Sequence, residues 1–128
     1  MTVHLDTSAL IDSLSGPRRS IDGLIALAHE GHRLSLSSIV LYEWLRGPRH
    51  RAELVAQEEL FPRHACVPFG PAQADAAAKL YKMLKKVRGR EIDLAVAACA
   101  LVDGAALWTL NRRDFEDIPN LKLVSPAS

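Results

Sequence analysis

Four positions in the chain place acidic or amide side chains among hydrophobic neighbours. These positions are Asp6, Glu43, Asp93, and Asn111 together with Asp114. An unpaired buried carboxylate is energetically costly, so four such positions in 128 residues need a common explanation. Mg²⁺ prefers oxygen ligands, and protein sites usually offer it one or two carboxylates plus water. The residue types therefore indicate a magnesium site, whereas no histidine or cysteine has the spacing of a zinc ligand.

Each position also has a purely structural explanation. Asp6 could cap the helix that follows it, and Glu43 could pair with Arg46 at i+3, worth only a few tenths of a kcal/mol. Asp93 would be stabilised by the dipole of a helix that it opens, and Asn111 could form an Asx turn. Strand ends and helix starts at one edge of a parallel sheet converge in space. Their joint arrangement therefore favours a functional site.

Hydrophobic periodicity predicts strands that alternate with helices. The expected strands are residues 3–5, 33–36, 65–68, 106–110 and 121–124. The expected helices are residues 7–14, 17–30, 39–46, 49–60, 71–87 and 91–103. This alternation predicts an α/β fold around a mainly parallel sheet.

Length and composition are those of one intracellular domain over residues 1–128. The chain is 48% hydrophobic with a net charge of +1, which excludes general disorder. No apolar run reaches the roughly 18 residues of a membrane span, and the N-terminus lacks a signal-peptide pattern. Cys66 and Cys99 lie in apolar surroundings without metal-type spacing, so we expect reduced core thiols. We therefore expect a soluble, cytoplasmic protein without a membrane partner.

The acidic positions lie in four motifs that occur in a fixed order. The motifs are Leu5-Asp6-Thr7-Ser8, Tyr42-Glu43-Trp44-Leu45-Arg46-Gly47, Ile92-Asp93-Leu94-Ala95-Val96-Ala97-Ala98 and Leu107-Trp108-Thr109-Leu110-Asn111-Arg112-Arg113-Asp114-Phe115. Together they resemble the PIN-domain nucleases, most closely the VapC-type toxins of prokaryotic toxin–antitoxin pairs. The resemblance covers essentially the whole chain. It implies a three-layer α/β/α fold and a ribonuclease that depends on Mg²⁺ or Mn²⁺. It also implies a homodimer and silencing by a cognate antitoxin.

The resemblance also assigns roles to individual residues. The first three acidic positions of the family fall on Asp6, Glu43 and Asp93, which would hold the metal directly or through water. The fourth falls on Asn111, where many relatives have aspartate, and Asp114 could supply the missing charge. Ser8 and Thr109 match hydroxyl positions beside the carboxylates and would orient ligands or water. Trp44 and Leu45 are expected at a surface that a second copy or an antitoxin covers.

Basic residues near the motifs could hold the phosphates of an RNA substrate, such as tRNA or another structured RNA. Arg46, Arg112 and Arg113 are adjacent to the motifs. A second basic cluster consists of Lys79, Lys82, Lys85, Lys86, Arg88 and Arg90. For its lysines a solvated helix face is an equally good explanation. The expected activity is an endoribonuclease in which metal-activated water leaves 5′-phosphate and 3′-hydroxyl ends.

A non-catalytic RNA-binding or protein-interaction module with a PIN-like fold is the alternative. Asn111 keeps this alternative open because it carries no charge, whereas Asp6, Glu43 and Asp93 argue against it. A receiver-type phosphorylation domain would need paired carboxylates after the first strand, which the chain lacks. A phosphatase of the Asp-x-Asp type would need aspartate where Ser8 stands.

Overall fold

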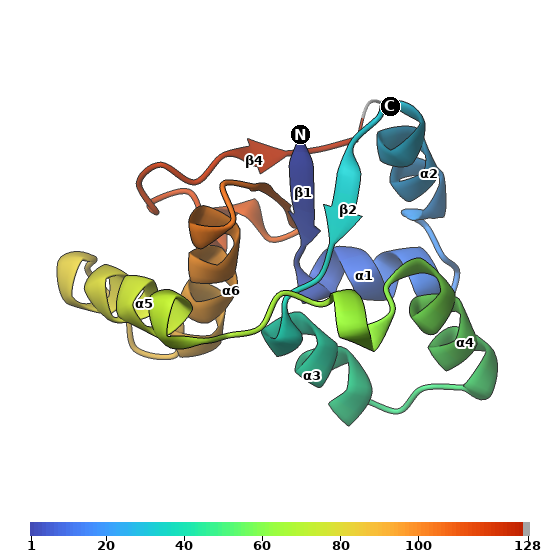
Figure 1. The fold of residues 1–128 in the computed structure, drawn as a ribbon, viewed down its shortest axis with the longest axis horizontal. Coiled ribbons are helices and arrows are strands. Elements are labelled where there is room, and N and C mark those ends of the chain that lie inside the picture. Colours follow the sequence, from blue (N-terminus) through green and yellow to red (C-terminus); the bar gives the residue numbers. More distant parts are fainter. Residues whose placement is uncertain (127–128) are drawn as a thin grey trace.

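A computed structural model describes residues 1–126, in which four strands form one parallel sheet (Figure 1). The strands are β1 (Thr2–Leu5), β2 (Arg33–Ser35), β3 (Ala106–Trp108) and β4 (Leu123–Val124). Their order across the sheet is β2-β1-β3-β4, and every pairing is parallel. Parallel neighbours require crossover connections, so the helices lie between strands in the sequence. The predicted α/β fold is confirmed.

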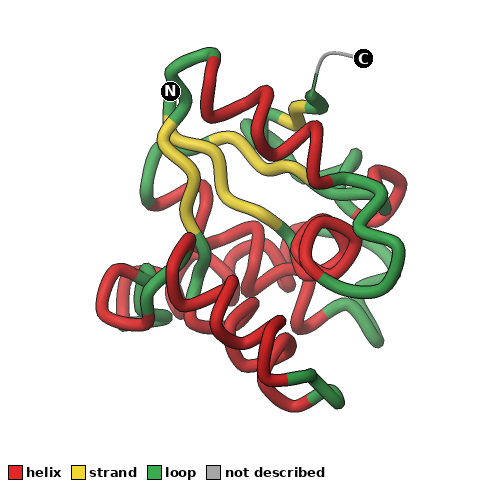
Figure 2. The backbone as a smooth tube through the Cα atoms, turned by 90° about the vertical axis from the view of Figure 1, so that its right-hand side faces the viewer, coloured by secondary structure: helices red, strands yellow, loops and turns green. Residues whose placement is uncertain are grey.

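Six helices make these connections in the described part of the chain. They are α1 (Thr7–Leu14), α2 (Ile21–His29), α3 (Ser38–Arg46), α4 (Arg51–Leu60), α5 (Pro71–Met83) and α6 (Glu91–Val102). Crossovers are right-handed, so the β1–β2 and β2–β3 connections cover opposite faces of the sheet. In Figure 1, β1 and β2 lie between α2 and α6. Figure 2 shows most helical turns below the strands, and these turns surround the carboxyl ends of β1 and β2.

The hydrophobic core forms around β1 and α6. Val3 and Leu5 are fully buried in β1, as expected for a strand with sheet on both sides. Helix α6 is apolar nearly all round, and residues 94–100 are all buried. A helix of this composition must lie in the centre of a domain. Burial of α6 therefore fixes the position of its first turn, which carries Asp93.

The predicted strand at residues 65–68 is wrong. A short 3-10 helix spans Arg63–Ala65, and only Val67 pairs with the sheet, through a single bridge to Ser37. Val67 donates its amide to the carbonyl of Leu36 at 2.9 Å. The pairing does not continue, because Ser38 begins α3 and the amide of Phe69 donates to Ser38 Oγ at 3.0 Å.

Three other predicted boundaries are also corrected. The helix predicted from residue 17 begins at Ile21, because Arg18 has φ +55°, outside the helical region. The helix predicted to residue 87 ends at Met83, because Leu84 is extended, with φ −87° and ψ 159°. Lys86 and Gly89 have positive φ and turn the chain into α6. The strand predicted to residue 110 ends at Trp108.

Trp44 does not lie at a surface, contrary to the expectation. Its side chain is fully buried, and the guanidinium of Arg49 lies 4.2 Å from the ring centroid. Tyr42 is the exposed aromatic residue of α3. Both cysteines are free, with Cys99 buried and Cys66 half-buried. No helix formed by residues 1–126 is both long and apolar enough to cross a membrane.

Candidate active site

Asp6 lies where β1 ends and α1 begins. Its amide donates to the carbonyl of Trp108 at 2.9 Å, which holds the position beside β3. Its side chain is only 5% exposed and makes no capping bond to α1, so the helix-cap explanation fails. Oδ2 of Asp6 instead accepts hydrogen bonds from Ser8 Oγ at 3.0 Å and Thr109 Oγ1 at 2.8 Å. Both predicted supporting hydroxyls thus contact the same carboxylate oxygen.

The same two hydroxyls also hold the chain that follows β3. Ser8 Oγ accepts the amide of Leu110 at 3.0 Å, and Thr109 Oγ1 accepts the amide of Asn111 at 3.0 Å. These bonds replace sheet pairing beyond Trp108, which explains why β3 is shorter than predicted. The loop that carries Asn111 and Asp114 therefore begins directly beside Asp6.

Glu43 lies on α3 with a side chain that is 17% exposed. Its Oε1 accepts the hydroxyl of Thr7 at 2.6 Å, and Arg46 Nη2 approaches Oε2 at 3.4 Å. The pairing with Arg46 that the structural explanation required is therefore present, alongside a hydroxyl partner. Thr7 is a contact that the sequence analysis missed. Its only sequence signal is a hydroxyl residue directly after Asp6.

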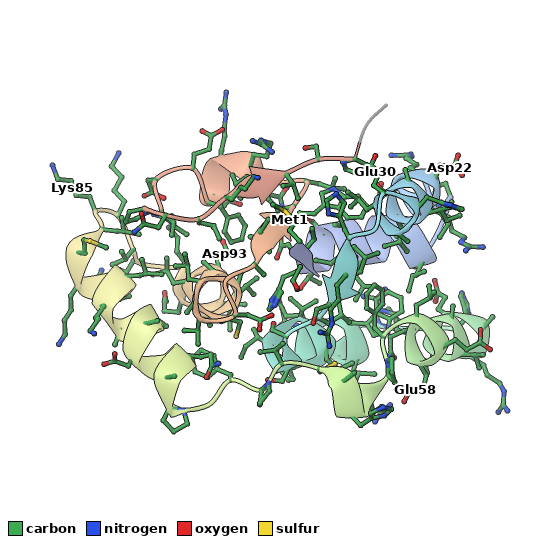
Figure 3. The ribbon with its side chains drawn as sticks, turned by 45° about the horizontal axis from the view of Figure 1, so that its top comes forward. Met1, Asp22, Glu30, Glu58, Lys85 and Asp93 are labelled. Carbon is green, nitrogen blue, oxygen red and sulfur yellow. The ribbon has the colours of Figure 1, made fainter. Side chains whose placement is uncertain are left out.

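Asp93 lies in the first turn of α6, near the middle of the molecule in Figure 3. Burial raises the pKa of its carboxyl from 3.8 to about 6, and the negative charges of Asp6, Asp114 and Glu43 add to the increase. Arg90 acts in the opposite direction. A helix dipole alone would lower this pKa. Asp93 is therefore more than a helix-start residue, because its environment is dominated by burial and other carboxylates.

Asn111 and Asp114 lie at the two ends of a short turn after β3. Asn111 precedes the 3-10 helix Arg112–Asp114, and its side chain makes no capping hydrogen bond. The Asx-turn explanation therefore fails. Both side chains are exposed. Asp114 is close enough to influence the pKa of Asp93.

The predicted basic residues occupy different environments. Arg112 Nη1 donates to Ser125 Oγ at 3.3 Å, and Arg113 is exposed beside it. Lys79 pairs with Asp75 on α5 at 3.0 Å, and Lys82 and Lys86 are exposed. Lys86 follows the end of α5, so the three lysines do not share one helix face. Figure 3 shows Lys85 at the outer end of this region, away from Asp93.

The donor atoms suit a hard cation, although they do not form a closed cage. Within residues 1–126, no three His, Cys, Asp or Glu side chains are grouped closely enough to hold a metal ion. The carboxylates nevertheless share one electrostatic site, since three of them raise the pKa of Asp93. Magnesium sites typically use one or two carboxylates and keep several waters. An all-oxygen set of this kind fits that pattern.

Comparisons with known proteins agree with this architecture. Residues 3–121 match the PIN domain family. The chain is 29% identical over 123 residues to a protein named Ribonuclease VapC19 from Mycobacterium tuberculosis, covering 92% of this chain and 95% of that protein.

Solved structures share the fold at lower identity. The structure of VapBC2 from Rickettsia felis bound to a promoter DNA fragment has a TM-score of 0.77 at 24% identity, and the match covers 97% of this chain and 98% of the matched chain. DNA-bound VapBC from Salmonella typhimurium has a TM-score of 0.74 at 24% identity, covering 97% of each chain. A toxin–antitoxin complex from Klebsiella pneumoniae has a TM-score of 0.72 at 24% identity, covering 98% of each chain. The family match spans most of the sequence and ends beyond all four acidic positions, so this chain belongs to the PIN-domain family.

Proposed function

We propose that this protein is a metal-dependent endoribonuclease and the toxin of a toxin–antitoxin pair. Membership of the PIN-domain family supports a nuclease. A relative that spans 92% of the chain is named a ribonuclease. The solved structures with the same fold include toxin–antitoxin complexes, which supports an antitoxin as the protein partner.

One observation carries the catalytic proposal: Asp6 is a buried carboxylate without a cationic partner. It is 5% exposed, and none of the ion pairs formed by residues 1–126 includes it. Ser8 and Thr109 both donate to Oδ2, so neither uses Oδ1. Two hydroxyl groups do not neutralise a buried charge, and a divalent cation would.

Mg²⁺, with Mn²⁺ as a substitute, would be held by Asp6, Asp93 and Glu43, directly or through water. When bound, the ion would activate a water molecule and neutralise charge at the attacked phosphate. The hydroxyls of Ser8 and Thr109 fix the orientation of Asp6. Asp93, with a pKa of about 6, is mostly ionised at neutral pH and available as a ligand. We expect products with 5′-phosphate and 3′-hydroxyl ends.

The fourth oxygen position belongs to Asn111 or Asp114, which the loop after β3 carries past the buried carboxylates. Both side chains are exposed, and, besides burial, the charge of Asp114 raises the pKa of Asp93. The RNA phosphates would be held outside the acidic site by nearby guanidinium groups, because unshielded carboxylates repel phosphate. Those candidates are Arg46, Arg112 and Arg113, with Lys79, Lys82 and Lys86 further along the chain.

Cleavage of RNA by the purified protein tests the enzymatic proposal. We expect cleavage with Mg²⁺ or Mn²⁺, none with EDTA, and none by Asp6→Asn. Asp75→Asn is the matched control, since it removes an exposed carboxylate from α5 that only pairs with Lys79. Undiminished cleavage in EDTA would overturn the metal mechanism.

Growth of a bacterial host tests the toxin proposal. We expect expression of the wild-type chain to arrest growth and Asp6→Asn to relieve the arrest. Co-expression of a cognate antitoxin should also relieve it, and light scattering would test the expected homodimer. Harmless expression of a folded protein that cleaves RNA would refute the toxin role.

A non-catalytic module is the second candidate, and the neutral side chain of Asn111 favours it. That candidate predicts RNA binding with no cleavage at any Mg²⁺ or Mn²⁺ concentration. The RNA cleavage assay, run together with a measurement of RNA binding, distinguishes the nuclease from the non-catalytic module.

A further inference from the structure

Arg90 makes the most complete ion pair in the described part of the chain. Its Nη1 donates to Asp117 Oδ2 at 2.9 Å and its Nη2 to Asp117 Oδ1 at 2.6 Å, a two-pronged geometry. Nη2 also donates to the backbone carbonyl of Asp114 at 3.0 Å. The Arg90 side chain is 19% exposed. Two-pronged arginine–carboxylate bonds fix geometry as well as charge.

These bonds join the two segments that carry the outer acidic residues. Arg90 directly precedes α6, and its carbonyl accepts the amide of Leu94 at 2.9 Å. It therefore lies three residues before Asp93 on the same turn. Its partners, Asp114 and Asp117, belong to the loop after β3. The connection spans 27 residues of sequence.

The loop from residue 110 to residue 117 is thus attached at both ends. Ser8 and Thr109 hold its first amides beside Asp6. Arg90 holds its far end beside Asp93. Phe115, which is buried, secures the middle by hydrophobic packing but cannot orient a carboxylate.

The positive charge of Arg90 also stabilises this arrangement. Asp93, Asp114 and Asp117 are all acidic residues on the two segments that Arg90 joins. Without a cation between them, the loop and α6 would bring three negative side chains together. A guanidinium at this point offsets the repulsion while the loop stays closed.

We propose that Arg90 is a positioning residue of the candidate active site, which anchors the Asn111–Asp117 loop to α6 through Asp117. This inference rests on the proposed nuclease function, and it removes Arg90 from the predicted RNA contacts. Among the described residues, the side-chain hydrogen bonds of Arg90 go to Asp114 and Asp117 of the protein's own loop, whereas Arg88 two residues earlier is exposed. Arg88 is therefore the matched control for a guanidinium that serves RNA alone.

The test uses Arg90→Met, Asp117→Asn and the double variant beside Arg88→Met. Hydrogen exchange of the amides of residues 111–117 is measured in metal-free protein, and Mn²⁺ affinity by electron paramagnetic resonance. We expect either single variant to speed exchange in the loop and to weaken Mn²⁺ binding about 10–100-fold, the range for residues that orient metal ligands. The double variant should be no worse than Arg90→Met, because Arg90→Met already removes the ion pair that Asp117→Asn weakens.

Cleavage kinetics distinguish positioning from RNA contact. If Arg90 positions the loop, Arg90→Met and Asp117→Asn should both lower kcat with little change in KM. If Arg90 binds RNA, Arg90→Met should raise KM as Arg88→Met does, and Asp117→Asn should leave RNA binding unchanged or tighter. That second pattern would overturn the proposal.

Hydrogen exchange of the loop amides tests the anchoring role independently of Mn²⁺ affinity and cleavage kinetics. Wild-type exchange at residues 111–117 in a folded Asp117→Asn protein would also overturn the proposal, and that variant changes a side chain that is 47% exposed. A wild-type chain that cleaves no RNA would refute the proposed function. Faster loop exchange and weaker Mn²⁺ binding in the variants would still support the anchoring role.

Discussion

Asp6 is held by two hydroxyl groups rather than by a basic side chain. Ser8 and Thr109 fix the carboxylate through Oδ2, and they leave its negative charge uncompensated. An arginine at this position would neutralise the charge and compete with a metal ion. Hydroxyl groups orient the carboxylate without that competition, so the residue types around Asp6 suit reversible binding of a cation.

Asp93→Asn should stabilise the metal-free protein at neutral pH while abolishing cleavage. The raised pKa means that the ionised carboxyl is disfavoured in the folded state, with burial as the main cause. After solvent screening, we expect a gain of about 1 kcal/mol in the free energy of unfolding. Urea denaturation of the wild-type and Asp93→Asn proteins without metal measures this difference in the free energy of unfolding.

Glu91→Gln provides the control in the same helix turn. Glu91 is exposed and accepts the amide of Gly89, a bond that glutamine can keep. This variant should gain no stability and retain cleavage. If Asp93→Asn were less stable than wild type and fully active, Asp93 would be a helix-start residue and the site assigned here would be refuted.

Helix α6 and strand β3 are the elements that bring Asp93 and the loop after β3 to the same place. A tight turn at Gly104 connects them, with φ +65°. The amide of Gly104 donates to the carbonyl of Leu101 at 3.1 Å, and that of Ala105 to Ala100 at 2.9 Å. This is a helix C-terminus of the kind that glycine favours.

Gly104→Ala should therefore destabilise the protein without affecting the chemistry. A Cβ at this position would meet no atom within 4 Å, so the cost comes from backbone strain alone, about 1 kcal/mol. Thermal denaturation should show the loss, and cleavage per folded molecule should equal that of wild type. Gly104→Asn, which tolerates this conformation better, should lose less. Equal stability of the alanine variant would show that the turn relaxes.

Local patterns predicted the elements well where composition and periodicity agree. The strand before Asp6 and the buried helix after Arg90 follow directly from apolar runs. The failures lie where backbone geometry and tertiary contacts decide. Leu84 leaves the helical conformation and ends α5, and the hydroxyl of Ser38 takes the amide of Phe69 that a longer strand would need. The burial of Trp44 depends on tertiary packing, which a pattern within one helix does not specify.

Burial and the charges of Asp6, Glu43 and Asp114 raise the pKa of Asp93, whereas two other contacts could not be read from the sequence. Thr7 bonds Glu43 across 36 residues, and Arg90 bonds Asp117 across 27. Each partner is an ordinary polar residue in its own segment. Only the fold brings the pairs together, which is why Arg90 was grouped with the basic cluster.

On the scale of the whole molecule, carboxylates are concentrated in one place although the net charge is only +1. They come from the end of β1, from α3, from α6 and from the loop after β3, at the carboxyl ends of the strands, where α/β sheets bind ligands. In the metal-free protein this concentration destabilises the fold locally, because the carboxylates repel one another. A bound cation would relieve that repulsion.

Mg²⁺ should therefore stabilise the folded protein, and the effect should depend on pH. The pKa of Asp93 is about 6 in the folded state against an ordinary 3.8, so the folded protein binds the additional proton. Stability of the metal-free protein should fall as pH rises between these two values and stay lower above them. Mg²⁺ competes with that proton, so its stabilisation should be small near pH 5. Above about pH 7 it should reach ~2.7 kcal/mol at a hundred times Kd.

Thermal denaturation with and without Mg²⁺, from about pH 5 to about pH 8, measures the coupling between Mg²⁺ binding and protonation of Asp93. Asp93→Asn is the control, because it has no proton to lose and should show neither the pH-dependent fall nor the full Mg²⁺ effect. Stabilisation of equal size near pH 5 and near pH 8 would mean that the ion binds away from Asp93. No stabilisation at any pH, in a protein that still cleaves RNA, would mean that the ion is held only when RNA phosphate completes its ligands.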